Sequence, residues 1–284
     1  MAKNVILCAD STCDLSPELI EKYQVHICPL HVLVGEQSYL DGVDMDPDKI
    51  YENYRQNGTL PKTAATNMDE YINFCKPFID AGNEVIYISL GSALSSSYNN
   101  CRLASMELDG MYAVNSCNLS TGSGHIVIEA AERIAKGMAA ADIVKELEEI
   151  IPKVSASFVL DTLEFLHKGG RCSALAMMGA NLLQLKPCIK VDATDGSMGV
   201  GKKYRGSLDK ALADYVKDQL ANKDALVTKR IFITHSGMSE ERINMVKSMV
   251  EELGIFEEIL ITRAGCTISS HCGPNTLGVL FITK

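Results

Sequence analysis

The sequence predicts an α/β protein of two domains, a layered α/β domain at residues 1–155 and an α+β domain at residues 156–284. Short β-rich runs alternate with helical patterns through the first half, which is typical of strands covered by helices. The pattern changes near residue 155, where a strand, a glycine pair and a hairpin follow one another. With 284 residues, 46% of them apolar, the chain has enough material to bury a core in each domain.

The first elements alternate between strand and helix. We expect β structure at residues 5–9 and again at residues 25–34, with Ser16-Pro17-Glu18 opening a helix between them. Asp46 before Pro47 predicts an N-cap followed by a proline in the first helical position. Asn67 and Glu70, three residues apart, match a capping box, so two further helix starts can be placed.

Two more strands are expected at residues 85–89 and 111–115, each ending in a polar loop that leads into a helical pattern. Ligands of open α/β sheets favour such strand ends. In the second half we expect a strand at residues 158–160 and a hairpin whose turn contains Asp195-Gly196. No long linker rich in Pro, Gly or Ser separates the halves, so we expect a tight interface between them.

Charge, hydropathy and cysteine usage exclude several classes of protein. The net charge of −9, without a basic tail, disfavours a nucleic-acid partner. The longest apolar runs fall far short of the roughly 20 residues that span a bilayer, so no transmembrane segment is expected. Ten cysteines scattered through apolar runs indicate reduced thiols and a cytoplasmic location. No metal is expected, because cysteines and histidines lack metal-ligand spacing.

Two clusters of hydroxyl side chains are candidates for a ligand site. The first, at residues 62–67, lies at a predicted helix start, and the second, at residues 89–98, follows a predicted strand. Serine and threonine also gather at helix caps for structural reasons alone, and the residues themselves leave that interpretation open. The functional interpretation is that hydroxyls and helix-start amides together bind an anion.

Taken in order along the chain, these segments resemble the DegV family, and the resemblance spans nearly the whole sequence. Its most specific part is the block Asp-Thr-Leu-Glu-Phe-Leu-His-Lys-Gly-Gly-Arg at residues 161–171. The other matching pieces are Asp10-Ser11-Thr12-Cys13-Asp14-Leu15, Lys62-Thr63, Leu94-Ser95 with Ser97-Tyr98, and His271-Cys272-Gly273-Pro274 with Gly278 and Phe281. The resemblance implies a two-domain DegV-like fold with a lipid site between or beside the domains.

The same resemblance implies the function. Members of the family bind fatty acids, and some are the lipid-carrying subunit of a bacterial fatty acid kinase. We therefore expect a long-chain fatty acid as ligand, no other cofactor, and a separate kinase subunit as partner. The protein would present the carboxylate for acyl-phosphate formation in phospholipid metabolism, and would not be a catalyst alone.

By resemblance, Thr63 and Ser95 would bond the carboxylate, with Arg171 and His271 in the polar network around it. We assign the arginine and the histidine supporting roles, because two hydroxyl donors leave a carboxylate oxygen nucleophilic whereas a bidentate arginine draws charge away. From the residues alone, a single arginine is also compatible with a solvated ion, and a lone histidine with a satisfied core residue.

The chain departs from the family pattern at several positions. Ala64 and Ala65 stand where the family usually has serine and glutamine, which removes a hydroxyl and an amide beside Thr63. Ser96 stands in place of a usual glycine, where a positive φ would be affected. Asn275 replaces another glycine, and asparagine is well suited to the left-handed conformation, so that turn should be kept.

The acyl tail needs a dry slot, and residues 174–185 supply leucines and methionines around much of a predicted helix. The same pattern is typical of a buried core helix.

A rival class is an enzyme, either a lipid hydrolase using Ser95 with His271 or a phosphotransferase. Residues 196–203 nearly match a P-loop, but Lys203 stands where Ser or Thr is required, so we expect a hairpin there. No G-x-S-x-G elbow is present. A lipid-responsive regulatory protein is a third alternative.

Overall fold

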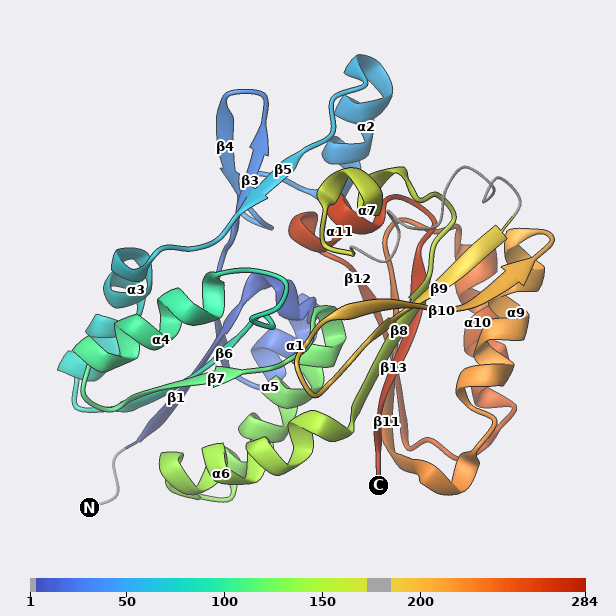
Figure 1. Ribbon diagram of the computed structural model, residues 1–284. Helices are drawn as coiled ribbons and strands as arrows, with labels where there is room; N and C mark the ends of the chain where they lie inside the picture. The colour runs from blue at the N-terminus through green and yellow to red at the C-terminus, as the bar shows by residue number, and fades with distance from the viewer. Residues whose placement is uncertain (1–3, 173–184) are drawn as a thin grey trace.

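The computed structural model describes residues 4–172 and 185–284 and shows a mixed α/β fold built on three sheets (Figure 1). The predicted fold class is therefore confirmed. A four-stranded sheet and a six-stranded sheet face each other across the helices α5 (Ser120–Ala135) and α6 (Ala140–Ile150). Outer helices cover the far face of each, so the molecule is layered as helix, sheet, helix, sheet, helix (Figure 1).

The four-stranded sheet is entirely parallel, as expected for strands that alternate with helices. Its order is β2 (Val25–Cys28), β1 (Val5–Asp10), β6 (Glu84–Ser89) and β7 (Met111–Asn115). The central strands β1 and β6 are buried for most of their length, because helices cover both faces. The outer face carries α3 (Met68–Asp80) and α4 (Ser97–Glu107).

The six-stranded sheet is antiparallel except for its last pair, β11 and β12. Helices α9 (Leu208–Gln219) and α10 (Glu240–Glu251) pack on its outer face. The strand order is β10 (Met198–Arg205), β9 (Leu185–Val191), β8 (Val154–Val159), β13 (Leu277–Thr283), β11 (Leu226–His235) and β12 (Glu258–Arg263).

A small third sheet lies at the upper left of Figure 1, above the four-stranded sheet. Its order is β4 (Gln37–Leu40), β3 (His31–Val34) and β5 (Lys62–Ala64). It packs with α2 (Pro47–Asn57), α7 (Glu164–Gly169) and α11 (Cys266–Cys272) around a small core of its own. The remaining elements of the described residues are α1 (Pro17–Lys22) and three 3-10 turns, η1 (Ser11–Cys13), η2 (Ile151–Lys153) and η3 (Lys223–Ala225).

Helix starts that the sequence marks are capped as expected. Asp46 accepts a hydrogen bond from the Lys49 amide at 2.9 Å, with Pro47 in the first turn of α2. Asn67 and Glu70 form both bonds of the capping box of α3. The hairpin around Asp195-Gly196 is also confirmed, because β9 and β10 pair antiparallel on either side of it.

The expected β run at residues 25–34 is corrected to two strands in different sheets. Pro29 lies between them and donates no backbone hydrogen bond, so β2 ends at Cys28 and β3 begins at His31. The backbone at Ser96 has a φ of −74°, so the absence of glycine causes no strain. Asn275 has a φ of 61°, which confirms the left-handed turn expected there.

The largest hydrophobic core joins the two large sheets. Side chains of α5 such as Ile126 pack against Ile88 of the four-stranded sheet and Phe232 of the six-stranded sheet in one cluster. The division into domains at residue 155 stays a prediction. Within residues 4–172 and 185–284, no helix combines the length and the apolar character needed to cross a membrane.

Candidate functional site

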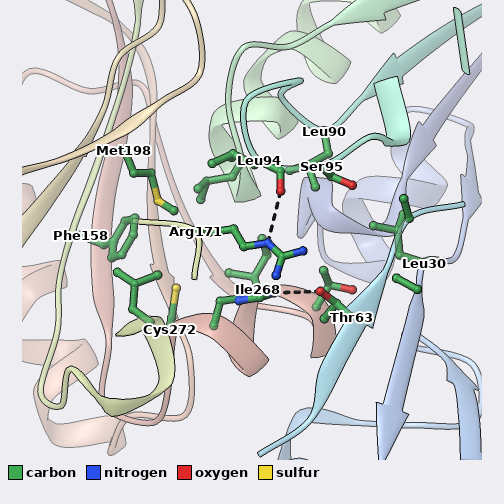
Figure 2. A pocket seen from close by; sticks show the side chains of 16 residues that line it. Leu30, Thr63, Leu90, Leu94, Ser95, Phe158, Arg171, Met198, Ile268 and Cys272 are labelled. Carbon is green, nitrogen blue, oxygen red and sulfur yellow. Dashed lines mark hydrogen bonds between the residues drawn. The ribbon is translucent and has the colours of Figure 1, made fainter. Parts of the chain in front are cut away.

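A cavity lies where the two large sheets and the small sheet meet, and we call it the first cavity (Figure 2). Its empty volume is about 550 Å³ with the open mouth included. Most of the wall is apolar, and the polar side chains in it are few. The lining residues are Leu30, Thr63, Ala64, Ala65, Leu90, Leu94, Ser95, Leu119, Phe158, Leu166, Arg171, Met198, Thr267, Ile268, His271 and Cys272.

All four residues predicted for the site line this cavity, although they come from four separate segments. Thr63 lies in β5, opposite Val32 of β3, rather than at a helix start. Ser95 lies in the loop between β6 and α4, Arg171 follows α7, and His271 lies in the last turn of α11. The structure therefore brings the four side chains together, while their roles toward a ligand stay a prediction.

Thr63 and His271 form a pair across the cavity wall. The Thr63 Oγ1 and His271 Nε2 atoms are 2.9 Å apart (Figure 2). Burial, with Arg171 as a second cause, lowers the pKa of His271 to about 4, so the ring is neutral at pH 7. A neutral ring carries one hydrogen, on either Nδ1 or Nε2. In the tautomer with the hydrogen on Nε2, His271 donates it to the Thr63 oxygen, and the hydroxyl hydrogen of Thr63 is left for a ligand oxygen.

Ser95 is oriented by the start of α4. Its hydroxyl accepts a hydrogen bond from the Ser97 amide at 3.2 Å and lies 2.9 Å from the Ser97 hydroxyl. Ser97 is fully buried, whereas Ser95 is partly exposed to the cavity. The first turn of this helix thus fixes the side-chain oxygen of Ser95.

Arg171 reaches in from the mouth and binds main-chain oxygens. Its Nη1 donates to the Gly169 carbonyl at 2.8 Å and its Nε to the Leu94 carbonyl at 3.5 Å. Figure 2 shows the guanidinium among the labelled cavity residues, with the bond to Leu94 dashed. Two of its five donors are therefore occupied, and these bonds hold a positive charge beside the Leu94-Ser95 segment.

Gly169 is required for the position of His271. A Cβ atom built on Gly169 would lie 2.3 Å from His271 Nδ1 and 3.2 Å from Cε1. These distances are well inside van der Waals contact, so only glycine lets the end of α7 approach the imidazole. The neighbouring Gly170 has a φ of +68° and open space around it, so its role is the left-handed turn that ends α7.

Two buried carboxylates anchor the start of α11. Asp41 accepts hydrogen bonds from the amides of Cys266 at 2.6 Å and Thr267 at 3.0 Å. Asp14 accepts from the Gly265 amide at 2.8 Å and from the Ser120 hydroxyl. These hydrogen bonds satisfy amides at the start of the helix that have no partner within it, so the pair fixes the helix that carries His271. Burial raises the pKa of Asp14 to about 8, which donors from Ser120 and Gly265 oppose.

A third buried carboxylate, Asp10, anchors the loop that leads to Ser95. It accepts hydrogen bonds from the Leu90 amide and the Ser89 hydroxyl, both at 2.8 Å. The hydroxyls of Tyr71 and Tyr87 complete its partners at 3.0 and 2.9 Å. The segment at residues 10–15, singled out by sequence, thus supports the site through Asp10 and Asp14 rather than lining the cavity.

A second cavity adjoins the first on the side of the six-stranded sheet. Its empty volume is about 320 Å³, and its wall includes Ser157, Thr234 and Leu280. Four residues line both cavities: Leu119, Phe158, Ile268 and Cys272. These four side chains form an apolar partition, so the two cavities are neighbours that share one wall.

Several lining residues were missed by sequence reasoning. Leu30 and Phe158 belong to apolar runs that look like ordinary core strands, Met198 lies in a glycine-rich hairpin, and only the fold brings them to one cavity. Thr267 had a usable signal, since it lies four residues before His271 on the same helix. Of the apolar stretch proposed for the tail at residues 174–185, residues 174–184 lie outside the described residues, and Leu185 begins β9.

The geometry bears on the rival chemistries. Ser95 and His271 each bond another partner, Ser97 and Thr63, and the His271 Nδ1 atom has no hydrogen-bond partner in the structure. A serine nucleophile with an oriented histidine base is therefore not assembled. Residues 198–203 lie in β10 of a hairpin, not between a strand and a helix. In the described ranges, no group of three or more His, Cys, Asp or Glu is arranged to hold a metal ion.

Comparison with known proteins gives a consistent match. A family model described as an uncharacterised protein of the DegV family matches residues 4–284. A DegV domain-containing protein of Clostridium perfringens is 31% identical over 279 residues, which cover 97% of each chain. A solved DegV family protein from Thermus thermophilus, described by its fatty acid binding, is 27% identical with a TM-score of 0.90. DegV of Bacillus subtilis, described as a fatty acid binding protein, is 26% identical with a TM-score of 0.86. Each of these two structural matches covers 100% of this chain and 100% of the solved chain.

Proposed function

This chain belongs to the DegV family, and we propose that it binds a long-chain fatty acid in the first cavity. It would present the carboxylate to a partner kinase that forms the acyl phosphate. The observation that carries the proposal is the contrast within one cavity, an apolar wall with the hydroxyls of Thr63 and Ser95 in it. The Thermus and Bacillus proteins, which match over the whole chain, are described as binding fatty acids, and this supports the ligand class.

The arrangement of the polar groups suits a carboxylate that must stay reactive. Thr63 and Ser95 are each held by one neighbour and retain capacity for a ligand oxygen. Arg171 has two of its five donors on main-chain carbonyls, which orients the guanidinium beside the site and agrees with the supporting role that we assign to it. A carboxylate bonded by neutral hydroxyls keeps more charge on its oxygens than one clamped by a guanidinium, and that charge is what attacks a phosphoryl group.

The acyl tail would run along the partition and into the second cavity. Leu119, Phe158 and Ile268 are shared by both cavities, so rotation of these side chains would join the spaces. We place the protein in the cytoplasm. The buried thiols of Cys8 and Cys28 in the four-stranded sheet and of Cys75 in α3 are free, and this supports a reducing compartment.

Native mass spectrometry of the protein purified gently from a bacterial host tests the ligand. We expect about one fatty acid per chain, and stripped protein should bind palmitate or oleate. Incubation with nitrophenyl esters or with ATP should give no turnover, whereas ATP with the kinase of the same organism should give acyl phosphate. Protein that is always empty and binds neither acid would refute the proposal, and ester hydrolysis by the protein alone would favour the hydrolase.

A further inference from the structure

The hydroxyl of Thr267 is a buried polar group with no hydrogen-bond partner among the residues that the structure describes. Thr267 is 4% exposed, it lines the first cavity, and its Oγ1 atom makes no hydrogen bond in the structure. Leaving a buried hydroxyl unsatisfied costs free energy, and most such groups in proteins have a partner. An unsatisfied hydroxyl in a cavity wall therefore indicates that the partner belongs to the ligand.

The backbone fixes the direction of this side chain. Thr267 and His271 are four residues apart in α11, so they lie on the same face of the helix, and both line the first cavity. The amide of Thr267 is held by Asp41 Oδ2 at 3.0 Å. Asp41 also binds the Cys266 amide, so these amides at the start of α11 are already occupied and offer no anion site themselves.

The Thr267 hydroxyl belongs to the end of the first cavity that carries the hydroxyls of Thr63 and Ser95, which we call the polar end. Ile268 and Cys272 line both cavities, whereas Thr267 lines only the first. The Thr267 amide donates to Asp41, which also accepts from the Ser11 hydroxyl. The Ser11 hydroxyl in turn accepts from the amide of Leu30, at the start of the small sheet that carries Thr63. The position of Thr267 is thus on the side of the small sheet, away from the shared partition.

We propose that the Thr267 hydroxyl donates a third hydrogen bond to the ligand carboxylate, beside those of Thr63 and Ser95. This inference rests on the proposed function. A carboxylate has about four acceptor positions on two oxygens, so a third donor can be accommodated. Ala64 and Ala65, which line the same region, carry no polar side-chain atom, so Thr267 is the remaining hydroxyl in the described wall.

The test compares an acid with its neutral analogue in three variants of Thr267. Thr267→Val removes the hydroxyl at nearly constant shape, Thr267→Ala removes it with less steric demand, and Thr267→Ser keeps it. Affinities for palmitate and for hexadecanol are measured on the full chain after removal of bound lipid. We expect the valine and alanine variants to bind palmitate about 10- to 100-fold more weakly, with hexadecanol changed less than about threefold. The serine variant should stay within about threefold of the wild type for both ligands.

A spectroscopic measurement separates contact from packing. With palmitate labelled with carbon-13 at the carboxyl carbon, Thr267→Val should shift the carboxyl resonance, whereas a label at the terminal methyl should not move. Equal weakening of palmitate and hexadecanol, or palmitate affinity within threefold of the wild type in both the valine and alanine variants, overturns the role of Thr267. Wild-type protein that binds neither ligand overturns the proposed function itself, and this inference with it.

Discussion

The two ends of the first cavity are built on different principles. At the polar end, Thr63 is bonded to His271 and Ser95 to Ser97, so each hydroxyl has one fixed direction. At the other end, Phe158 and Ile268 belong to the largest hydrophobic core and are shared with the second cavity. The strength of a hydrogen bond depends on its angle and distance, whereas the free energy of an apolar contact depends mainly on the surface area that it buries. The polar end is therefore suited to positioning a ligand, and the apolar end to retaining it.

The magnitudes assign affinity mainly to the apolar end. Burying one methylene contributes about 0.8 kcal/mol, so a tail of a dozen or more contributes roughly 10 kcal/mol before ordering costs. A hydrogen bond to a charged group contributes only about 1.5 to 3 kcal/mol net. Substitutions at the polar end should thus change transfer to a kinase more than they change bound lipid.

The largest effect is expected from Gly169→Ala, which damages the polar end without altering a polar atom. Its Cβ would meet His271 at 2.3 Å, so the imidazole must move and Thr63 loses its partner. Displacement of a positioning group by about 1 Å can cost on the order of 100-fold in rate, and here two groups move. We expect kinase-dependent acyl-phosphate formation, measured by product mass spectrometry, to fall by more than about 100-fold.

Gly170→Ala is the matched control for Gly169→Ala. Its φ of +68° strains any other residue, which costs about 1 kcal/mol of stability, but no atom lies within 4 Å of the added methyl. The folded fraction should drop slightly while transfer per folded molecule stays near the wild-type rate. Equal transfer rates in the two variants would show that contact with His271 is not what Gly169 provides.

The next effect is expected from Thr63→Ala and Ser95→Ala. Each removes one fixed hydroxyl, and loss of a positioning contact near an oxygen that must attack in line can cost on the order of 100-fold in rate. Bound fatty acid should fall much less when lipid is abundant, because the tail dominates affinity. Occupancy by mass spectrometry and transfer with the cognate kinase are measured on one preparation, and parallel losses would contradict the division of labour between the two ends.

The third effect concerns pH and compares His271 with His125, a core histidine bonded to the Leu280 carbonyl. Burial lowers the pKa of both to about 4 from an ordinary 6.5. Between these values the unfolded chain binds more protons than the native one, so stability is full above pH 6.5 and falls as pH drops toward 4. At pH 5 each histidine should therefore lower the free energy of unfolding by about 2 kcal/mol relative to its value at neutral pH.

Glutamine variants of the two histidines separate structure from function. His271→Gln and His125→Gln should each flatten the fall in unfolding free energy between pH 6.5 and pH 5, as followed by urea denaturation. Only His271→Gln should also slow kinase-dependent transfer, because His125 lies in the core, packed against Phe232. A steep pH dependence that survives in both variants would mean that other groups carry it.

The sequence predicted the layered fold because alternation, caps and turn residues are local signals. Asp46, Asn67 and the Asp195-Gly196 turn all specify structure within four residues of themselves, and each is confirmed. The prediction of one β run at residues 25–34 was wrong, because β propensity does not reveal which sheet a strand joins. Thr63, Ser95, Arg171 and His271 were found by family resemblance, not by a local signal.

The rest of the site could not be predicted because it depends on contacts between distant segments. Asp41 supports α11 from more than 220 residues away in sequence, and no local pattern marks it as a helix cap. Gly169 stands in a glycine pair, but its closeness to His271 exists only in the folded chain. Thr267 reveals itself by an unsatisfied hydroxyl, which is a property of the three-dimensional structure.

The smallest effect is expected from Ile268→Val at the apolar end, one residue from Thr267. Ile268 is 9% exposed and lines both cavities, so it lies where the tail would pass between them. The substitution removes one methylene of contact, worth about 0.8 kcal/mol, and therefore about fourfold in affinity. Because apolar contact does not distinguish a carboxylate from an alcohol, palmitate and hexadecanol should weaken equally. Transfer per bound lipid should not change.

Thr267→Val and Ile268→Val together test the comparison most sharply, since they place the same residue at adjacent positions of one helix. The first should discriminate between palmitate and hexadecanol, and the second should not. Isothermal titration of both ligands into both variants gives the four affinities needed, with thermal unfolding as a check on the fold. If Ile268→Val instead weakened only palmitate, the carboxylate would lie at the partition, and the polar and apolar ends of the cavity would be assigned the wrong way round.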